Sequence, residues 1–290
     1  MSAVPTYLIK KISMQHLQWF PGHMTAAMRM MEDSVKLVDG VMMVLDARAP
    51  RASMNVKLNK LFANKKILYV LNKCDLISPA DAKRLIKEFA SEGKTAVSVS
   101  AMDKKAVDLL YTEMFNLLSD KLERNKLKGV FKPIRFLVAG IPNTGKSTII
   151  NALCGGKKTI TGNKAGVTKG KQWVRLKELE LLDTPGTMPP AFDNQELAKH
   201  LAYIGSMNDA NIDFNDLAYE LLIELKNKYP NLIKAKYGIE DLDVEPLELF
   251  NKICVGRGFL RRGGEYDYER LSTALIDDFR KGRIGKIILD

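Results

Sequence analysis

The residues best suited to chemistry form a glycine-containing loop at 140–147, which reads G-I-P-N-T-G-K-S. The pattern G-x-x-x-x-G-K-[ST] is that of a phosphate-binding loop, whose backbone N–H groups hold phosphate oxygens. Gly140 and Gly145 allow the backbone to curl around the anion. Lys146 can reach the β- and γ-phosphates of a nucleoside triphosphate, and the Ser147 hydroxyl can bind Mg²⁺. The expected nucleotide contacts in this loop are Asn143, Thr144, Gly145, Lys146, Ser147 and Thr148.

The sequence on both sides of the loop fits this function. An apolar stretch at 134–139 predicts a buried strand, and 147–153 predicts a helix whose N-terminus faces the phosphates. The alternative is a flexible glycine turn ahead of an ordinary helix. Because strand, loop and helix follow in the required order, we favour the phosphate site.

A second motif, N-K-C-D at 72–75, follows a predicted strand at 67–71. The Asp75 carboxylate can accept hydrogen bonds from N1–H and the exocyclic amine of guanine, while Asn72 can bond the O6 edge. Adenine lacks those two donors and would leave the carboxylate unpaired. The motif therefore predicts a guanine site formed by Asn72, Lys73 and Asp75.

Two weaker motifs complete a guanine-nucleotide site. Ser100 and Ala101 follow the next predicted strand and resemble the S-A-x box that backs the base, although alone they mean little. D-T-P-G begins at Asp183 and ends a strand downstream of the phosphate loop. We assign Asp183 to Mg²⁺, through water, and the Gly186 N–H to the γ-phosphate.

The stretch 157–171 is polar, basic and glycine-containing, which is typical of a mobile switch segment. It contains Thr168, which we expect to contact the nucleotide and its metal. The predicted Mg²⁺ ligands are therefore Ser147, Thr168 and Asp183.

Composition describes a globular protein with an excess of positive charge. The 290 residues (32.5 kDa) are 46% hydrophobic and 27% charged, and no apolar run approaches membrane-spanning length, so we expect a cytoplasmic protein without membrane contact. Three distant cysteines, Cys74, Cys154 and Cys254, argue against a disulfide framework or a cysteine-built zinc site. The net charge of +11 favours a polyanionic partner such as nucleic acid; a solvated basic surface is the alternative.

The periodicity predicts an α/β domain followed by a helical domain. We expect an N-terminal extension at 1–15, a P-loop GTPase domain with a mostly parallel sheet flanked by helices at 16–190, and a helical domain at 191–290, to which the family resemblance described below adds RNA binding. Further strands of the first domain are predicted at 41–45, 95–99, 172–176 and 179–182. Its other helices are predicted at 25–37, 58–64, 79–91 and 106–122, with 124–132 as a basic link. Helices of the second domain are predicted at 196–205, 217–228, 246–255 and 268–281.

The motifs stand in an unusual order, because the guanine box at 72–75 precedes the phosphate loop at 140–147. Ordinary small GTPases carry them in the reverse order. Each motif follows a strand, and ligands of an open α/β sheet bind at the carboxyl ends of strands, so all can converge whatever the chain order. The sequence therefore predicts a circularly permuted GTPase domain.

This order, with W-F-P-G-H-M at 19–24 and D-A-R-A-P at 46–50, closely resembles the bacterial YlqF/RbgA family of circularly permuted ribosome-biogenesis GTPases. The resemblance covers residues 16–290. It implies GTP/GDP binding and GTP hydrolysis stimulated by the large ribosomal subunit, late in maturation of that subunit. It also implies contacts of the C-terminal domain with ribosomal RNA and of the protein with ribosomal proteins, and we expect a monomer.

One position departs from the Ras-like pattern: Thr187 follows D-T-P-G where those enzymes carry a catalytic glutamine. Neither Thr187 nor Met188 is a convincing base. The family suggests the histidine of F-P-G-H-M, here His23, as the catalytic group; the alternative is a turn histidine that caps the following helix. Asn143 matches an asparagine in the phosphate loop of related GTPases that is associated with a bound K⁺ ion.

Other functions are compatible with the same motifs. An RNA-binding scaffold could hold GTP as a structural ligand, or a GTPase could act on another RNA substrate. A P-loop kinase of a small metabolite is disfavoured by N-K-x-D. The RNA contacts are predicted at Arg257, Arg261 and Arg262, with 157–171 as the alternative.

Overall fold

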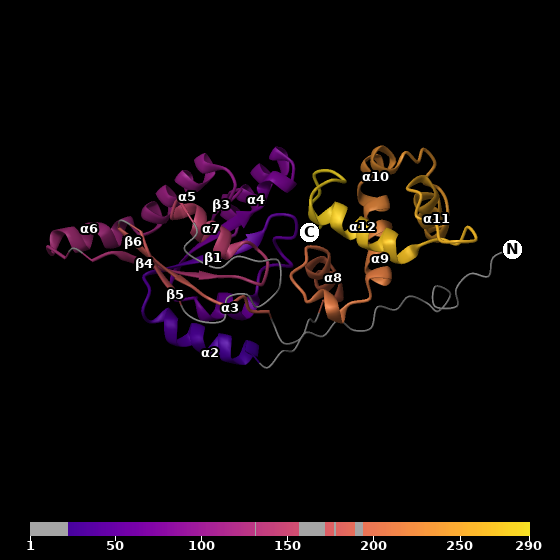
Figure 1. The fold of residues 1–290 in the computed structure, drawn as a ribbon. Helices are drawn as coiled ribbons and strands as arrows, with labels where there is room; N and C mark the ends of the chain where they lie inside the picture. The colour runs from indigo at the N-terminus through magenta and orange to yellow at the C-terminus, as the bar shows by residue number, and fades with distance from the viewer. Residues whose placement is uncertain (1–22, 131, 157–171, 177, 189–193) are drawn as a thin grey trace. The chain divides into compact units, whose positions relative to one another are not determined.

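The computed structural model describes residues 23–130, 132–156, 172–176, 178–188 and 194–290 (Figure 1). The chain divides into two compact units. One comprises Gln18–Asp193 and Ile288–Asp290, and the other comprises, among the described residues, Asn194–Ile287. The first is called the GTPase unit below and the second the helical unit. In the described part of the chain, no helix has both the length and the apolar character needed to cross a membrane.

The GTPase unit is built on a six-stranded sheet in the order β3-β2-β1-β4-β6-β5. All neighbouring pairs are parallel except β5 with β6, so the predicted mostly parallel sheet is confirmed. The strands are β1 (Gly40–Asp46), β2 (Lys66–Asn72), β3 (Thr95–Ser98), β4 (Ile134–Ala139), β5 (Gln172–Arg175) and β6 (Leu179–Asp183).

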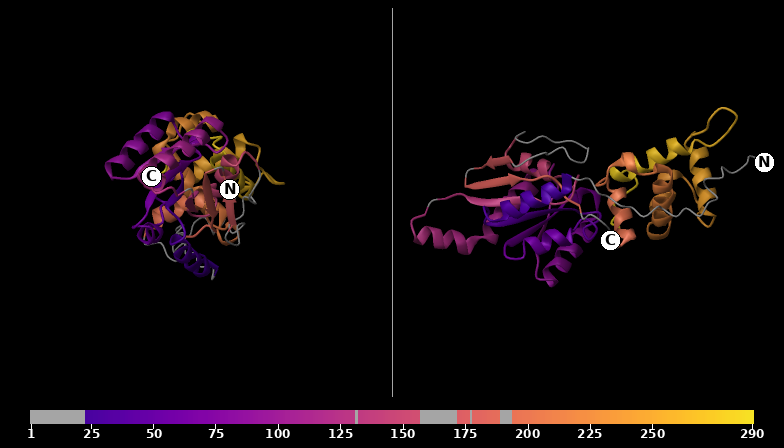
Figure 2. Two further views of the ribbon diagram at one scale, coloured as in Figure 1. Left: turned by 90° about the vertical axis from the view of Figure 1, so that its left-hand side faces the viewer. Right: turned by 90° about the horizontal axis from the view of Figure 1, so that it is seen from below.

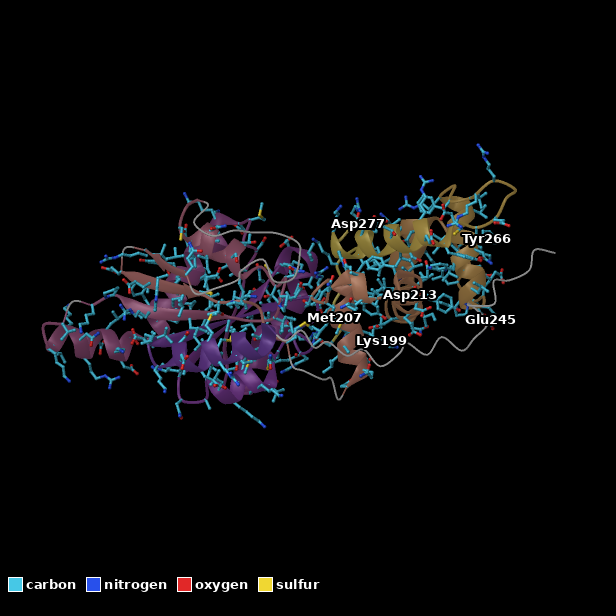
Figure 3. The ribbon with its side chains drawn as sticks, turned by 60° about the horizontal axis from the view of Figure 1, so that its bottom comes forward. Lys199, Met207, Asp213, Glu245, Tyr266 and Asp277 are labelled. Atoms are coloured by element: carbon cyan, nitrogen blue, oxygen red, sulfur yellow. The ribbon has the colours of Figure 1, made fainter. Side chains whose placement is uncertain are left out.

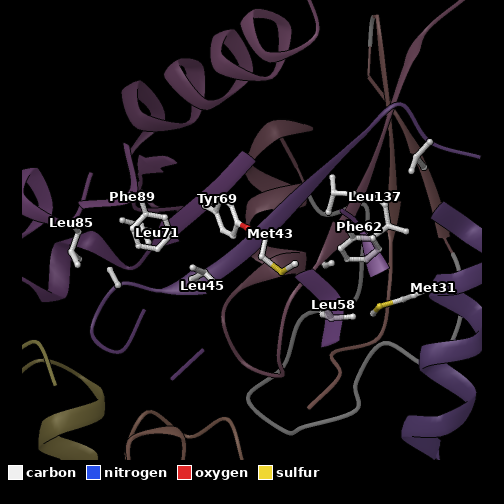
Figure 4. Packing of buried hydrophobic residues seen from close by; sticks show 14 of the residues in the cluster. Met31, Met43, Leu45, Leu58, Phe62, Tyr69, Leu71, Leu85, Phe89 and Leu137 are labelled. Carbon is white, nitrogen blue, oxygen red and sulfur yellow. The ribbon is translucent and has the colours of Figure 1, made fainter. Parts of the chain in front are cut away.

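Helices cover both faces of this sheet (Figures 1 and 2). They are α2 (His23–Val35), α3 (Val56–Leu61), α4 (Pro79–Ser91), α5 (Lys104–Leu117), α6 (Ser119–Leu127) and α7 (Lys146–Leu153). All seven residues of β1 are buried, as expected of a central parallel strand with helices on both faces. Met43 and Leu45 of β1 pack in one core cluster with residues of α2, α3 and α4 (Figure 4). Met42 and Val44 point to the other cluster, with α5 and α7.

The predicted helix at 106–122 is two helices in the structure. The chain breaks at Leu118, which is both the last cap of α5 and the first cap of α6. The first four residues of the expected link at 124–132 are therefore helical, and α6 projects from the end of the sheet at which β4 begins (Figures 1 and 2).

The described part of the helical unit consists of five α-helices and a short 3-10 turn. The helices are α8 (Gln195–Tyr203), α9 (Phe214–Lys228), α10 (Pro230–Tyr237), α11 (Pro246–Gly256) and α12 (Tyr268–Arg280). The side chains of this unit are shown in Figure 3. Helix α9 packs against each of the other four. Helix α10 was not predicted from the sequence; Pro230 starts it, and Gly238 ends it in the left-handed conformation (φ 67°).

The last residues return to the GTPase unit rather than staying with the helical unit, where they were expected. The Leu289 N–H donates to the carbonyl oxygen of Arg48 at 2.7 Å. The Asp290 carboxylate accepts from the N–H groups of Arg51 (3.0 Å) and Ala52 (2.7 Å). The D-A-R-A-P loop is thus bonded to a segment more than 230 positions away in the sequence.

Candidate nucleotide site

The phosphate loop joins the end of β4 to the start of α7, as the sequence predicts. Gly140 has φ 147°, and a Cβ there would lie 2.4 Å from the carbonyl oxygen of Val44. Gly145 has φ 92°, and a Cβ would lie 2.3 Å from Nδ2 of Asn72. Any side chain at either position would therefore displace the neighbouring strand or the guanine box.

Asn72 connects three of the predicted motifs. It is 2% exposed at the carboxyl end of β2, and its Nδ2 donates to the carbonyl oxygen of Thr144 in the phosphate loop at 2.8 Å. Its Oδ1 accepts from the N–H of Ala101, in the S-A box, at 3.3 Å. Asp75 follows in an exposed turn, where its carboxylate can meet a ligand. The geometry therefore brings the N-K-x-D, S-A and phosphate-loop motifs together despite their permuted order.

Lys73 adds a second link between the guanine box and the phosphate loop. Its Nζ donates to the carbonyl oxygen of Asn143 and to Oδ2 of Asp46, each at 2.8 Å. Both Lys73 (φ 61°) and Asn143 (φ 60°) have left-handed backbones, and they are the non-glycine residues with positive φ in the described chain. The ammonium group thus holds two unusual turns against each other.

Asp46 and Arg48 form a buried ion pair beneath this link. Arg48, 2% exposed, donates from Nε at 3.0 Å and from Nη2 at 2.8 Å to the fully buried carboxylate of Asp46. Burial raises the pKa of Asp46, but Arg48 and Lys73 outweigh that effect and hold it well below its usual range. No role beyond membership of the D-A-R-A-P motif was predicted for these two residues, because Lys73, which also bonds Asp46, lies in a separate segment.

The metal side of the site contains oxygen donors that fit Mg²⁺. The Ser147 hydroxyl donates to Oδ2 of Asp183, at the end of β6, at 3.1 Å. Among the described residues no group of three or more His, Cys, Asp or Glu could hold a metal by itself. A hydroxyl and one buried carboxylate suit Mg²⁺, which keeps several waters and takes substrate phosphates as ligands.

Lys146 lies beside these groups at the start of α7. Its Nζ donates to the carbonyl oxygen of Ile141 at 2.8 Å. Burial lowers the pKa of Lys146 to about 8, although the nearby carboxylate of Asp183 acts in the opposite direction. A group that is costly to charge in the free protein is therefore placed where phosphates would stabilise its charge.

The D-T-P-G segment lies directly against the phosphate loop. A Cβ on Gly186 would lie 2.7 Å from the backbone nitrogen of Pro142 and 3.0 Å from Nζ of Lys146, so only glycine fits. The next N–H, of Thr187, donates to the carbonyl oxygen of Gly140 at 3.3 Å. Asp183 and Gly186 thus lie beside the loop that they are predicted to serve.

Thr187 and Met188 are both turned into the protein. Thr187 is fully buried, with its Oγ1 3.9 Å from the sulfur of Met31. Its carbonyl oxygen accepts from Nδ2 of Asn55, the N-cap of α3, at 3.3 Å. Met188 is 2% exposed. Neither side chain is therefore positioned to orient an attacking water.

Two predicted site residues fall wholly or partly outside the described part of the chain. Thr168 lies outside the described residues. His23 is the first residue of α2, whereas the sequence placed it just ahead of the helix; its side chain lies outside the described part.

The fold and the site define a circularly permuted P-loop GTPase. The guanine box follows β2 and the phosphate loop follows β4, yet Asn72 and Lys73 bond directly to that loop.

Comparisons with known proteins agree with this class. The family model "50S ribosome-binding GTPase" matches residues 135–245. Ribosome biogenesis GTPase A of Priestia megaterium is 35% identical over 277 residues, which cover 94% of this chain and 96% of the relative. The protein of that name from Thermotoga maritima is 31% identical, with 93% of each chain covered. The crystal structure of GNP-bound YlqF from T. maritima matches with a TM-score of 0.62 and 27% identity, covering 91% and 97% of the two chains. The chain belongs to the ribosome biogenesis GTPase A (YlqF/RbgA) family.

Proposed function

We propose that the protein binds and hydrolyses GTP as an assembly factor for the large ribosomal subunit, and that the subunit precursor stimulates its turnover. The observation that carries the nucleotide part is the hydrogen bond from Asn72 to Thr144, which joins the guanine box to the phosphate loop. The ribosomal part is supported by relatives named ribosome biogenesis GTPase A. A cytoplasmic monomer that contacts ribosomal RNA and ribosomal proteins fits this function.

The nucleotide contacts follow from the site. Asp75 would select guanine, with Asn72 and Lys73 holding its turn against the phosphate loop. Lys146, Thr148 and the Gly186 N–H would hold phosphate oxygens, and the segment with Ser100 and Ala101 would back the base.

Ser147 and Asp183, with Thr168, would hold Mg²⁺, and Asn143 is the candidate for K⁺. Bound there, Mg²⁺ would neutralise charge that develops on the phosphates. The chain's own contribution is to hold the Ser147 hydroxyl, in the first turn of α7, 3.1 Å from Oδ2 of Asp183 at the end of β6.

Hydrolysis needs a group that orients water, and Thr187 is buried against Met31. We therefore assign that role to His23, at the start of α2, in the ribosome-bound state. The isolated enzyme would be slow for the same reason.

The test is phosphate release with and without purified large ribosomal subunits, and small subunits serve as the matched control particle. We expect multiple turnovers that rise only with the large subunit. A single stoichiometric release, unchanged by the large subunit, would instead identify an RNA-binding scaffold with GTP as a structural ligand.

A further inference from the structure

The positive charge of the chain is unevenly distributed between its two parts. Residues 194–287 contain 14 Lys and Arg against 16 Asp and Glu, a formal charge of −2. Residues 1–193 contain 31 Lys and Arg against 17 Asp and Glu, a formal charge of +14. The excess that favours a polyanionic partner therefore lies outside the helical unit.

Within the GTPase unit, residues 121–135 are a dense basic run, with six Lys and Arg and one acidic residue. No residue of α6 is buried, and Leu127 is 87% exposed. Leu122 packs partly buried against the core, but the rest of this helix is not explained by core packing.

Helix α6 is nevertheless held firmly at its first turn. Asp120 accepts from Lys66 of β2 at 2.9 Å, and Lys121 pairs with Asp39, just before β1. The other carboxylate oxygen of Asp39 accepts from the N–H of Arg135 at 2.9 Å. These contacts fix α6 at the amino ends of β1, β2 and β4, the opposite end of the sheet from the nucleotide site.

Two strands extend the positive surface from α6. Arg135 of β4 and Arg175 of β5 both lie opposite Glu180 of β6 in the sheet register. The Arg135 guanidinium lies 5.1 Å from the centre of the Trp173 ring, which is 42% exposed. The basic patch is defined as Arg124, Lys126, Lys128, Lys132, Arg135 and Arg175. Arginine and lysine beside an exposed indole can bind phosphates and stack on a base.

Three lysines of this patch differ from the paired cations of the helical unit, whereas Arg135 of the patch is itself paired with Glu180 at 2.8 Å. Lys126, Lys128 and Lys132 are exposed and form no ion pair within the described part of the chain. In the helical unit, by contrast, Arg257 pairs with Asp278 and Arg261 with Glu269, each at 2.9 Å. Cations already paired with carboxylates release fewer counterions when they meet RNA.

We propose that the basic patch is an RNA-contact surface, which binds the phosphate backbone with α6 and stacks a base on Trp173. The choice of RNA, rather than an acidic protein, rests on the proposed function. The surface lies on the GTPase unit, so RNA would bind the unit that also contains the nucleotide site.

The test compares two triple variants of the full chain, each lowering the net charge by three. The patch variant is Lys126→Gln/Lys128→Gln/Lys132→Gln, and the matched control is Arg261→Gln/Arg262→Gln/Lys281→Gln in the helical unit. Binding to a fluorescein-labelled 20-nucleotide RNA hairpin is measured between 50 and 300 mM KCl. We expect the patch variant to bind about 10-fold or more weakly at 0.1 M salt, with a slope of log K against log salt reduced by about two to three units. The control should stay within about threefold of the parent.

Equal losses in both variants, an unchanged slope in the patch variant, or no hairpin binding by the parent would overturn the proposal. So would competition by poly-glutamate as strong as that by unlabelled hairpin, which would identify an acidic protein partner. Trp173→Ala should lower hairpin affinity about fivefold or more, whereas binding by charge alone would leave the affinity of this variant equal to that of the parent.

Ribosome-dependent hydrolysis separates this inference from the proposed function. If large subunits stimulate the parent but the patch variant behaves like the parent in hairpin binding, only the inference fails. If large subunits do not stimulate the parent, the proposed function fails whatever the hairpin shows. GTP binding measured without ribosomal subunits should be the same in the parent, the patch variant and the control variant.

Discussion

Lys73 of the guanine box donates a hydrogen bond to the carbonyl oxygen of Asn143 in the phosphate loop at 2.8 Å. The same ammonium group bonds Asp46, which Arg48 holds in place. The two halves of the nucleotide site are therefore joined directly to each other, through residues of three separate segments.

Asp46→Asn should destabilise the GTPase unit by about 3 kcal/mol, because it leaves the buried guanidinium of Arg48 without its counter-charge. The measurement is the free energy of unfolding in urea. Asp120→Asn is the matched control, since it breaks an exposed pair with Lys66 and should leave stability almost unchanged. Equal effects of the two substitutions would show that the buried pair has no special role.

Asp75→Asn should weaken the binding of GTP by a few kcal/mol, because an amide cannot accept hydrogen bonds from both guanine donors. XTP, which presents a carbonyl where guanine has its amine, should bind better to the variant than to the parent. Titration of both proteins with both nucleotides gives the comparison. GTP affinity equal to that of the parent would mean that Asp75 does not read the base.

GTP binding should take up protons at alkaline pH, because burial lowers the pKa of Lys146 to about 8 in the free protein and bound phosphates raise it. Below pH 8 the lysine is already charged, so affinity is complete there and falls as pH rises above 8. Calorimetry at pH 7 and pH 9, in two buffers of different ionisation enthalpy, measures this uptake. We expect close to one proton at pH 9 and little at pH 7.

Asp75→Asn provides the control for this measurement, since it should lower affinity at both pH values without changing proton uptake. The same small uptake at both pH values in the parent would show that Lys146 keeps its proton without the nucleotide.

The sequence predicted the parts of the site that are local. Each box is a short motif at the end of an apolar strand, so the convergence of 72–75 and 140–147 at one sheet edge followed from the alternation of strands and helices. The predicted bounds of helix α4, 79–91, agree with the structure at both ends. Its start could be predicted because Ser78 caps the helix and Pro79 is its first residue.

The rest depended on contacts between distant segments. The ion pair between Lys73 and Asp46 and the return of Asp290 to Arg51 leave no periodic pattern in the sequence. Helix α6 was predicted partly as a link because Leu122 and Leu127 are its apolar residues, too few to set a helical period.

Neither Thr187 nor Met188 is placed to orient the attacking water, so we expect the catalytic group to come from another segment. Thr187 has the place of a catalytic glutamine but is fully buried. His23→Ala should therefore leave GTP affinity and large-subunit binding nearly intact, while ribosome-stimulated turnover falls by roughly 10² or more, the usual contribution of a positioned general base. A neutral imidazole can orient water, and an unperturbed histidine is mostly neutral at pH 7.

Glu32→Gln, an exposed change on the same helix α2, is the matched control and should keep the stimulated rate. Nucleotide affinity, subunit binding and single-turnover hydrolysis should be measured on the same samples, because a loss of docking would also lower the rate. His23→Gln separates the two roles of the histidine, since an amide can orient water without acting as a base. Partial recovery in His23→Gln would indicate orientation of the water. Rates for His23→Ala within a few-fold of the parent, with binding unchanged, would mean that His23 only caps α2 and that the ribosome supplies the catalytic group.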